Sequence, residues 1–392
     1  MTNLLDTIKK VTNKQVSPKP VKSEPVSINE RQEVWLNDKR LKWPKKKVIK
    51  EAEHDSYKLV IISHDDELSD PNETAPLIRD NAKKLGIEVH LAESMGSYLE
   101  DGEGDNKLLY SYPVDKKGRA LLPTMKKESE YMKPIMMNPK DTIVMMRGLN
   151  PNPKNGCQSW WVMGRTLEYA GFELINSVDC NRMCNDKWYN QMMFQRHNIN
   201  SPETYLIRHS EGAKDSAAKL KNKYPMILKT AVGAQGVGVM FIESERALVS
   251  VVQLLYREDP YIDILLQEYI PTSYDVRAIV CKGTVMGAMK RPVIQGDFRS
   301  NISQGSQPSM MKLTDMEKAE CLRAAEAVDG SLVGVDFIPA KNRESEKPFF
   351  IEVNATPGLT GIEGAVKRNN GNKSITDDIL NNMRNILSKL AV

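Results

Sequence analysis

No stretch of the sequence is apolar enough to cross a membrane, because roughly 18 uninterrupted apolar residues would be needed and charges break every run earlier. The opening residues, MTNLLDTIKKVTNKQ, are also interrupted by charges before any useful apolar stretch. We therefore expect no signal peptide, no membrane contact and a cytoplasmic location.

Cysteine and histidine are scarce as well. The five cysteines are scattered and odd in number, which favours reduced thiols over a disulfide framework. Cys180 and Cys184 have no cysteine or histidine partners at metal-site spacing, so a zinc site is not expected. The five histidines show neither triad nor metal spacing, and we interpret them as structural or surface residues.

Charge is distributed unevenly along the chain. Residues 1–50 hold 13 Lys and Arg against 5 Asp and Glu, a net charge of +8, whereas the remainder has a net charge of −4. Residues 1–55 interleave proline with lysine, and we predict a basic, largely disordered arm there. Basic arms often contact nucleic acid or acidic protein surfaces, although a solvated tail is the interpretation that we favour.

Beyond the arm, the pattern predicts an α/β protein. The run YKLVIIS is a strand, a helix-periodic stretch covers 74–86, and IEVHLA is a second strand, which together make a βαβ unit of a parallel sheet. We place the first α/β domain at 56–178, with an irregular insertion or small hairpin at 95–140. The second domain, 179–392, has an α+β pattern and ends in an amphipathic helix.

A glycine-rich loop joins two predicted strands in YPMILKTAVGAQGVGVMFIES. Gly233, Gly236 and Gly238 let backbone N–H groups approach an anion without side-chain obstruction. A Walker loop would end in Gly-Lys-Ser/Thr and a Rossmann loop would precede a helix, and neither applies here. The loop suits a lid over nucleotide phosphates, with the Lys229 ammonium at a phosphate oxygen. An ordinary hairpin turn with a solvent-facing Lys229 is the alternative.

Two carboxylates lie on neighbouring predicted strands near the end of the chain. LVGVDFI carries Asp336, and PFFIEVNA carries Glu352 and Asn354, which share a face because they are two apart. A turn near Glu344 would place Asp336 about opposite Glu352, where the charges repel and are costly to bury. A divalent cation removes that cost, and all three side chains offer the oxygen ligands that Mg²⁺ prefers. Such sites are shared with substrate phosphates, so ATP is implied again; solvent-facing edge residues are the alternative.

Arginines gather in the stretch between these two motifs. DVRAIV carries Asp275 and Arg277 on one face of a predicted strand, Arg291 closes the next strand, and GDFRSN places Arg299 and Asn301 in a loop. Arginine clamps carboxylate and phosphate groups in bidentate fashion. Several arginines near a Mg–ATP site suggest one clamp for an acceptor carboxylate and another for a transferring phosphoryl group, with surface ion pairs as the alternative.

Together these stretches resemble the RimK-type branch of the ATP-grasp superfamily, best known for adding glutamate to the C-terminus of a ribosomal protein. The matching motifs are INSVDCNRMCNDKWYNQMMFQRHNINSPET, LKTAVGAQGVGV, LQEYI with DVR, MKRPVIQGDFRSN, and VGVDF with FIEVNATPGLTGIE. The resemblance covers about 145–390, and 57–145 only in its α/β pattern. It implies an ATP-grasp fold behind an N-terminal parallel α/β domain, with a lid subdomain at about 200–270 and a catalytic subdomain at about 271–392.

The resemblance also implies how the nucleotide is held. Lys187 and Lys229 would contact the phosphates, the backbone of Glu268 and Tyr269 would read the adenine, and Asp275 would contact the ribose side of the nucleotide. The lid loop would contribute Gly233, Gln235, Gly236 and Gly238.

Catalytic and metal-binding roles follow from the same resemblance. The nucleotide and transition-state motif would consist of Arg299, Ser300 and Asn301. The metal ligands would be Asp336, Glu352 and Asn354, with Glu352 bridging two Mg²⁺ ions and Mn²⁺ as an alternative metal. Arg291 would hold the substrate carboxylate.

The expected function is therefore that of an ATP- and Mg²⁺-dependent carboxylate–amine ligase that works through an acyl phosphate. It would add glutamate or another amino acid to a peptide or protein C-terminus, a ribosomal protein among the candidates, and would form a homo-oligomer. The chain departs from the family at Gly305-Ser306, where two glycines are usual, and at the shorter segment 272–274. These departures lie where the acceptor would approach, so they bear on its identity.

Three other functions are compatible with the motifs. A ligase could act on a small-molecule acceptor with the same active site. A non-catalytic ATP-binding module could use the basic arm, whose contact with nucleic acid stays open, to dock on a partner. A phosphotransferase on the same fold would release phosphorylated product in place of phosphate and amide.

Overall fold

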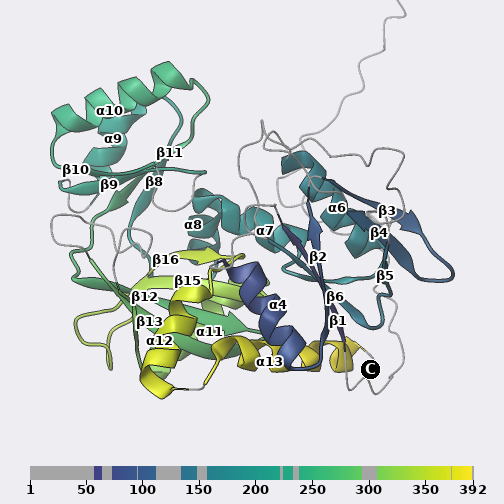
Figure 1. The fold of residues 1–392 in the computed structure, drawn as a ribbon. Helices are drawn as coiled ribbons and strands as arrows, with labels where there is room; N and C mark the ends of the chain where they lie inside the picture. The colour runs from purple at the N-terminus through teal and green to yellow at the C-terminus, as the bar shows by residue number, and fades with distance from the viewer. Residues whose placement is uncertain are drawn as a thin grey trace, which may run out of the picture. The chain divides into compact units, whose positions relative to one another are not determined.

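The computed structural model describes residues 57–63, 73–94, 96–111, 134–147, 157–220, 224–232, 238–293, 307–371 and 373–390. The basic arm, residues 233–237 of the glycine loop and the RSN motif lie outside these residues, so the predictions for them stay predictions. Within the described residues the strands form four sheets (Figure 1).

The N-terminal sheet is parallel, as the βαβ pattern predicted. Its order is β2-β1-β6-β7, and all neighbouring strands run parallel. Its strands are β1 (Lys58–Ser63), β2 (Glu88–Glu93), β6 (Thr142–Met146) and β7 (Glu173–Ile175). Helix α4 (Thr74–Lys84) connects β1 to β2 and buries Ala75, Ile78 and Ala82, which recur at helical spacing along one face.

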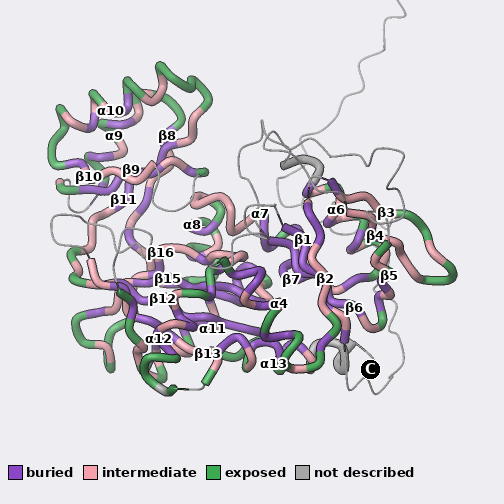
Figure 2. Tube along the Cα trace, in the orientation of Figure 1, coloured by how far each residue is buried: buried purple, intermediate pink, exposed green. Residues whose placement is uncertain are grey.

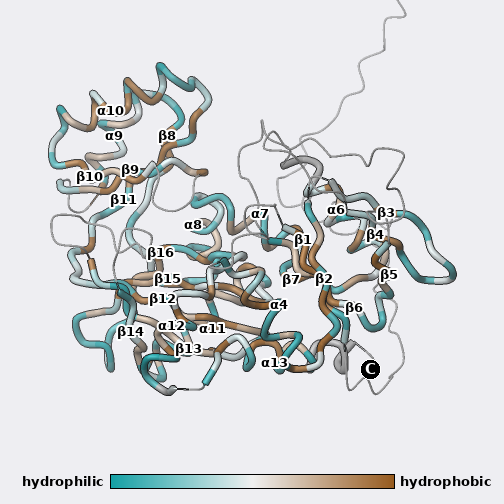
Figure 3. Tube along the Cα trace, viewed as in Figure 1, coloured by the Kyte–Doolittle hydropathy of each residue, from teal (hydrophilic) through white to brown (hydrophobic). Residues whose placement is uncertain are grey.

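This sheet is buried on both faces, because successive side chains point to opposite sides and both sets are apolar. Leu59 and Ile61 belong to the same core as α4 and parts of the C-terminal region. Val60 and Ile62 belong to a second core, which includes residues of α6 (Cys157–Tyr169). Figure 2 shows β1 and β6 buried along most of their length, and Figure 3 shows hydrophobic residues concentrated along them.

The insertion at 95–140 contains a small antiparallel sheet, which is more regular than we predicted. Its strands are β3 (Ser97–Asp101), β4 (Lys107–Ser111) and β5 (Ile135–Met137). Tyr98 and Tyr110 stack with ring centroids 4.8 Å apart, and Leu109 and Met137 join the core beside β1 and β6. The stacked tyrosines are direct cross-strand partners and add to the stability of this small sheet.

The central sheet is antiparallel, with the order β10-β9-β11-β8. Its strands are β8 (Thr204–Ile207), β9 (Met226–Thr230), β10 (Val239–Ile242) and β11 (Ile264–Glu268). Helices α9 (Gly212–Lys219) and α10 (Glu245–Glu258) pack on it, and Ser244 caps α10 by accepting from the Ala247 N–H. The predicted pair of antiparallel strands around the glycine loop is confirmed.

The C-terminal sheet has the order β14-β13-β12-β15-β16 and is antiparallel throughout. Its strands are β12 (Tyr274–Cys281), β13 (Thr284–Pro292), β14 (Ser309–Met310), β15 (Leu332–Ile338) and β16 (Phe349–Asn354). One face packs on α11 (Asp315–Ala327), and the other packs on α12 (Thr360–Asn370) and α13 (Ile375–Leu390). The predicted Lys-Gly turn and final helix are both confirmed.

Two consecutive helices contact the outer edge of the C-terminal sheet. They are α7 (Val178–Asn185), capped by Ser177, and α8 (Lys187–Arg196), capped by Asp186. Both contact β16, the edge strand. Of the helices in the described residues, none has the length and apolar character that a membrane span requires. The predicted boundaries of the domains stay a prediction.

Candidate active site

Asp336 and Glu352 face each other across the last hairpin. The register of β15 and β16 pairs Asp336 with Glu352 and Gly334 with Asn354, which confirms the predicted opposition. The register shifts between Asp336 and Phe337, so a β-bulge lies directly beside the pair. Bulges of this kind re-aim side chains next to active sites. The Asp336 side chain is 6% exposed and that of Glu352 is 32% exposed, so Glu352 is the more accessible carboxylate.

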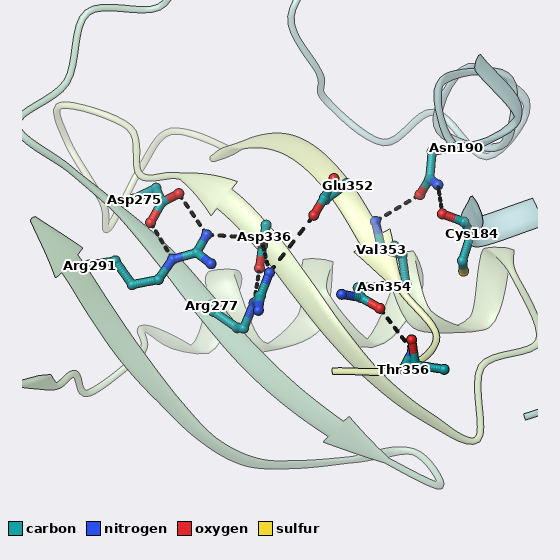
Figure 4. A network of polar contacts seen from close by, with 10 residues as sticks. All are labelled: Cys184, Asn190, Asp275, Arg277, Arg291, Asp336, Glu352, Val353, Asn354 and Thr356. Atoms are coloured by element: carbon teal, nitrogen blue, oxygen red, sulfur yellow. Dashed lines mark hydrogen bonds and ion pairs between the residues drawn. The ribbon is translucent and has the colours of Figure 1, made fainter. Parts of the chain in front are cut away.

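Asp336 on β15 is held by two arginines, one from the neighbouring strand β12 and one from β13, the next strand beyond it, as Figure 4 shows. Arg277 on β12 donates to both of its oxygens in a bidentate pair, at 2.7 and 2.6 Å. Arg291 on β13 donates to it at 2.9 Å and also forms a bidentate pair with Asp275, at 2.7 Å for both bonds. Arg277 further approaches Glu352 at 3.8 Å. The surface-pair alternative is therefore wrong for Arg277 and Arg291.

The cluster is nearly neutral by its own composition. Burial by itself would raise the pKa of Asp336, but the charges of Arg277 and Arg291 outweigh it and lower that pKa to about 2. Burial opposes the charge of Arg291, yet Asp336 and Asp275 raise its pKa. Three carboxylates and two guanidinium groups leave one formal negative charge, and Glu352 is its most exposed carrier.

The contacts of Arg291 and Asp275 bear on the roles that the resemblance implied. Arg291 is 5% exposed, and its guanidinium is bound to Asp275 and Asp336. Its Nε and Nη2 donate to these two carboxylates, which already neutralise the guanidinium charge and so disfavour a third carboxylate beside it. Asp275, at 7% exposed, is likewise bound to Arg291. Both implied roles stay predictions, and what the geometry places here is an ion cluster that fixes Asp336.

The three predicted metal ligands form a set of oxygen donors that fits Mg²⁺ together with phosphates. The Asn354 Oδ1 accepts one bond, from the Thr356 N–H at 2.8 Å, which leaves a lone pair. The Arg277 Nη2 lies 3.8 Å from the Glu352 Oε1, beyond hydrogen-bond distance. In the described part of the chain, no three His, Cys, Asp or Glu side chains cluster as a metal site. A cation here would therefore rely on nucleotide oxygens to complete its shell, as Mg²⁺ usually does.

Lys229 is a buried lysine that is hydrogen-bonded to a neutral amide. It lies on β9, is 9% exposed, and its Nζ donates to Gln267 Oε1 on β11 at 2.6 Å. Gln267 in turn donates to Thr204 Oγ1 at 2.8 Å, which orients its amide. Burial lowers the pKa of Lys229 to about 8, while the charge of Glu352 acts to raise it. A solvent-facing Lys229 is thus wrong, and a buried ammonium without a carboxylate bound to it suits an anionic ligand.

Lys187 lies at the first position of α8, close to the same charges. Burial lowers its pKa, and the charges of Glu352 and Asp186 act to raise it. Its backbone N–H donates to the Ala231 carbonyl at 2.9 Å, and Asp186 forms an isolated antiparallel β-bridge with Val232. The start of α8 is thus joined to the chain that directly follows β9. The charge of Glu352 therefore acts on both predicted phosphate lysines, although β9 and α8, which carry them, are separate elements of the chain.

The predicted hinge begins at Glu268, the last residue of β11. The Glu268 N–H donates to the Glu203 carbonyl at 2.8 Å, so an adenine would be read by other backbone groups of the hinge. The Tyr269 ring packs edge-to-face on Phe241, with centroids 5.0 Å apart. Gly238 ends the lid loop with φ of +78°, and a Cβ there would lie 2.4 Å from Thr230 Oγ1, so only glycine fits.

Several predicted site residues lie outside the described residues, and their roles stay predictions. They are Gly233, Gln235, Gly236, Arg299, Ser300 and Asn301.

Sequence reasoning missed three residues that the structure brings to the site. Arg277 was noticed only for sharing a face with Asp275, yet it is the bidentate partner of Asp336. Gln267 binds Lys229, and a polar residue in the apolar run ILLQE was the available signal. Asn190 binds the backbone beside Glu352, and nothing in its local pattern distinguished it from an ordinary helical asparagine.

Comparison with known protein families gives a match over half of the chain. A family model described as a RimK-like ATP-grasp domain matches residues 184–379. A probable alpha-L-glutamate ligase 1 from Pseudoalteromonas atlantica is 33% identical over 213 residues, which is 54% of this chain and 68% of that protein. A probable alpha-L-glutamate ligase from Haemophilus ducreyi is 33% identical over 222 residues, which is 55% of this chain and 70% of that protein.

Solved structures share the fold over most of the chain. The ATP-grasp ligase PsnB, in complex with a minimal precursor, has a TM-score of 0.58 at 16% identity and covers 85% of this chain and 99% of its own. The D-cycloserine synthetase DcsG has a TM-score of 0.56 at 14% identity, with 85% and 99% covered. At these identities the likeness concerns the fold alone.

Proposed function

The chain belongs to the RimK-like ATP-grasp family of ligases, and we propose that it joins a carboxylate to an amine at the expense of ATP. The observation that carries the proposal is the meeting of two kinds of charge. Lys229 on the central sheet and Lys187 at the start of α8 form one side of the site, and Asp336 and Glu352 on the C-terminal sheet form the other. The charge of Glu352 acts on both lysines. A Mg²⁺-bound polyphosphate is the ligand that satisfies both sides together.

The proposed reaction has two steps. An oxygen of the acceptor carboxylate attacks the γ-phosphorus of ATP, the bond to the β-phosphate oxygen breaks, and ADP leaves with an acyl phosphate formed. The nitrogen of the amine then attacks the acyl carbon, the C–O bond to phosphate breaks, and inorganic phosphate leaves as the nitrogen loses a proton. Lys229 and Lys187 orient the phosphates and offset their charge, and the predicted Arg299 and Asn301 stabilise the tetrahedral oxyanion.

Mg²⁺ would be held by Asp336, Glu352 and Asn354, and when bound it neutralises charge on the phosphate oxygens. We propose two ions with Glu352 shared between them, and Mn²⁺ as a workable substitute. The buried ion cluster fixes Asp336 in its charged form, because Arg277 and Arg291 hold its pKa well below neutral pH.

The substrate class is argued from the relatives. Curated relatives are named glutamate ligases, and neighbours in fold are ligases seen with precursor peptides. We propose glutamate as the amine and the C-terminal carboxylate of a peptide or protein as the acceptor, with ribosomal proteins among the candidates. A homo-oligomer is proposed from the family resemblance alone.

The test is Mg²⁺-dependent product formation with glutamate and a panel of peptides that end in free carboxylates, read by mass spectrometry. Wild type is compared with Glu352→Ala and with Glu344→Ala, a matched change at an exposed glutamate in the same hairpin. We expect mass gains in steps of one glutamyl residue, lost in the first variant and kept in the second. Nucleotide binding with no amide product on any acceptor, including small carboxylic acids, would favour the binding-module alternative.

A further inference from the structure

Strand β16, which carries Glu352 and Asn354, is the edge strand of the C-terminal sheet. The outward N–H groups of an edge strand have no strand to pair with, and when buried they need another acceptor. Helices α7 and α8 pack along this edge. The position of both candidate metal ligands therefore depends on which groups form hydrogen bonds with the outer side of β16.

Asn190 on α8 forms a hydrogen bond with the end of β16 that carries the metal ligands. Its Oδ1 accepts from the Val353 N–H at 2.7 Å, and Val353 is the residue between Glu352 and Asn354 (Figure 4). Its Nδ2 donates to the carbonyls of Met183 and Cys184 at 3.3 Å and to that of Asp186 at 3.5 Å. The side chain is 1% exposed, and its shortest bond is the one to the strand. The three longer bonds orient the amide so that its oxygen points at β16.

A second asparagine fastens the other end of the same strand and provides an internal comparison. Asn200 accepts from the Phe350 N–H through its backbone carbonyl at 2.8 Å, and its Nδ2 donates to the carbonyl of Pro348 at 3.1 Å. The bulge in the β15–β16 ladder lies between these two attachment points. Asn200 thus holds β16 before the bulge, and Asn190 holds it after the bulge, where the ligands are.

Asn190 also lies one helical turn after Lys187 on α8. The start of α8 is bound to the end of β9, two residues beyond Lys229, through the Lys187 N–H and the Asp186 bridge. The helix therefore connects both lysines to the carboxylate strand, and Asn190 makes the side-chain contact with that strand.

We propose that Asn190 is a positioning residue, which holds the backbone between Glu352 and Asn354 and thereby sets the affinity of the site for Mg²⁺. The inference rests on the proposed function, because it takes these two residues as metal ligands. Asn190 touches neither substrate nor metal in this account, and it acts through Val353.

The experiment measures binding without any acceptor or amine. Mg²⁺ is titrated by calorimetry into the full-length protein saturated with a non-hydrolysable ATP analogue, and the analogue alone is titrated in the presence of EDTA. We expect Asn190→Ala to weaken Mg²⁺ binding about tenfold and to change metal-free nucleotide affinity less than about twofold. Asn200→Ala removes the side-chain bond to the Pro348 carbonyl, just before the strand, and keeps the backbone bond to Phe350, so it should leave both affinities within about twofold.

A second variant covers the case in which Asn190→Ala does not fold. In Asn190→Thr the hydroxyl can bond the carbonyl four residues earlier in the helix, as threonine does in helices, but it offers no amide oxygen to Val353. Hydrogen exchange adds a readout that general destabilisation would not produce. The Val353 amide should exchange faster in both Asn190 variants relative to the Phe350 amide, and Asn200→Ala should leave the Val353 amide protected.

Glu352→Ala separates failure of this inference from failure of the proposed site. Unchanged Mg²⁺ affinity in both Asn190 variants, together with weakened affinity in Glu352→Ala, would overturn the positioning role and leave the metal site standing. Equal weakening in Asn200→Ala would also overturn it, since any loosening of β16 would then suffice. Unchanged affinity in Glu352→Ala itself would overturn the metal site and the inference with it.

Discussion

The C-terminal sheet and the central sheet hold their buried charges in different ways. On the C-terminal sheet, Asp336 is bound by Arg277 and Arg291, and Asp275 is bound by Arg291, so the charges largely cancel one another. On the central sheet, Lys229 is equally buried but is bound to the neutral amide of Gln267. Burial accordingly lowers the pKa of Lys229 to about 8, whereas the arginines lower that of Asp336 to about 2 despite its burial.

This difference suggests two roles within one site: the paired charges maintain its structure, and Lys229 binds the ligand. The self-neutralised cluster pairs its own charges without a ligand and fixes the position of Asp336. The lysine without a carboxylate partner stores an unsatisfied charge that an anionic ligand relieves, which favours binding of a phosphate at that point. Charges of the first kind should matter mainly for stability, and those of the second kind mainly for nucleotide affinity.

The largest expected effect is on stability, from Arg291→Met. This change leaves Asp275 and Asp336 buried beside each other with half of their positive charge removed, and we expect a loss of about 3–5 kcal/mol in the free energy of unfolding. Urea unfolding measures it, with Arg79→Met as the control. Arg79 forms an exposed pair with Asp80, and its removal should cost less than about 1 kcal/mol. Equal losses for both variants would contradict the cluster's structural role.

Lys229→Met should lower nucleotide affinity, whereas Arg291→Met should lower the free energy of unfolding. Losing one charge-assisted contact to phosphate should weaken ATP-analogue binding by about 10- to 100-fold, and the free energy of unfolding should stay the same or rise because a desolvated ammonium is removed. Calorimetric titration and urea unfolding measure the two quantities. Lys219→Met, at an exposed lysine of α9, should change neither. A large loss of stability in Lys229→Met would break the proposed division of roles.

Gln267→Glu would give the buried charge on the central sheet an oppositely charged partner, as the buried charges on the C-terminal sheet have. A carboxylate at this position would pair with Lys229 and remove the charge that a phosphate would otherwise satisfy. We expect nucleotide affinity to fall about tenfold, and the pKa of Lys229 to rise. Gln253→Glu, the same charge change at an exposed position of α10, controls for long-range repulsion of the nucleotide. Unaltered affinity in Gln267→Glu would show that Lys229 is not used by the ligand.

A smaller effect is expected from pH. In the free protein the pKa of Lys229 is about 8, and bound phosphate favours the charged form, so the pKa in the complex lies higher. Binding above pH 8 therefore takes up a proton, and affinity should fall with rising pH by up to about tenfold per unit, with no dependence from this group below about pH 7. Titrations between pH 7 and 9.5 test this, and Lys229→Arg should remove the slope.

Much of the fold could be predicted because local patterns and global packing agree. Strands such as β1 and β6 are continuous apolar runs, as a parallel sheet buried on both faces requires, and α4 has a helical apolar stripe. The opposition of Asp336 and Glu352 followed from hairpin geometry and is confirmed. The small sheet within 95–140 was harder, because its short strands are only partly buried and β5 is distant in sequence from β4.

The site was harder to predict than the fold, since its partners come from separate elements. That Arg291 binds two aspartates depends on the alignment of β12 with β13 and of β12 with β15, which the residue's own motif does not contain. The bond from Val353 to Asn190 joins positions 163 apart in the sequence. Patterns identify the residue types that suit Mg²⁺ and phosphate, but which charges neutralise each other is settled by tertiary packing.

The most direct test of the central claim follows an oxygen atom. The carboxyl oxygens of an accepted peptide are labelled with ¹⁸O, and the phosphate released during amide formation is analysed by mass spectrometry. Activation through an acyl phosphate predicts one ¹⁸O atom in each phosphate released per amide formed, and no labelled phosphate from Glu352→Ala. Unlabelled phosphate accompanying amide formation, or a phosphorylated acceptor as the final product, would contradict the account.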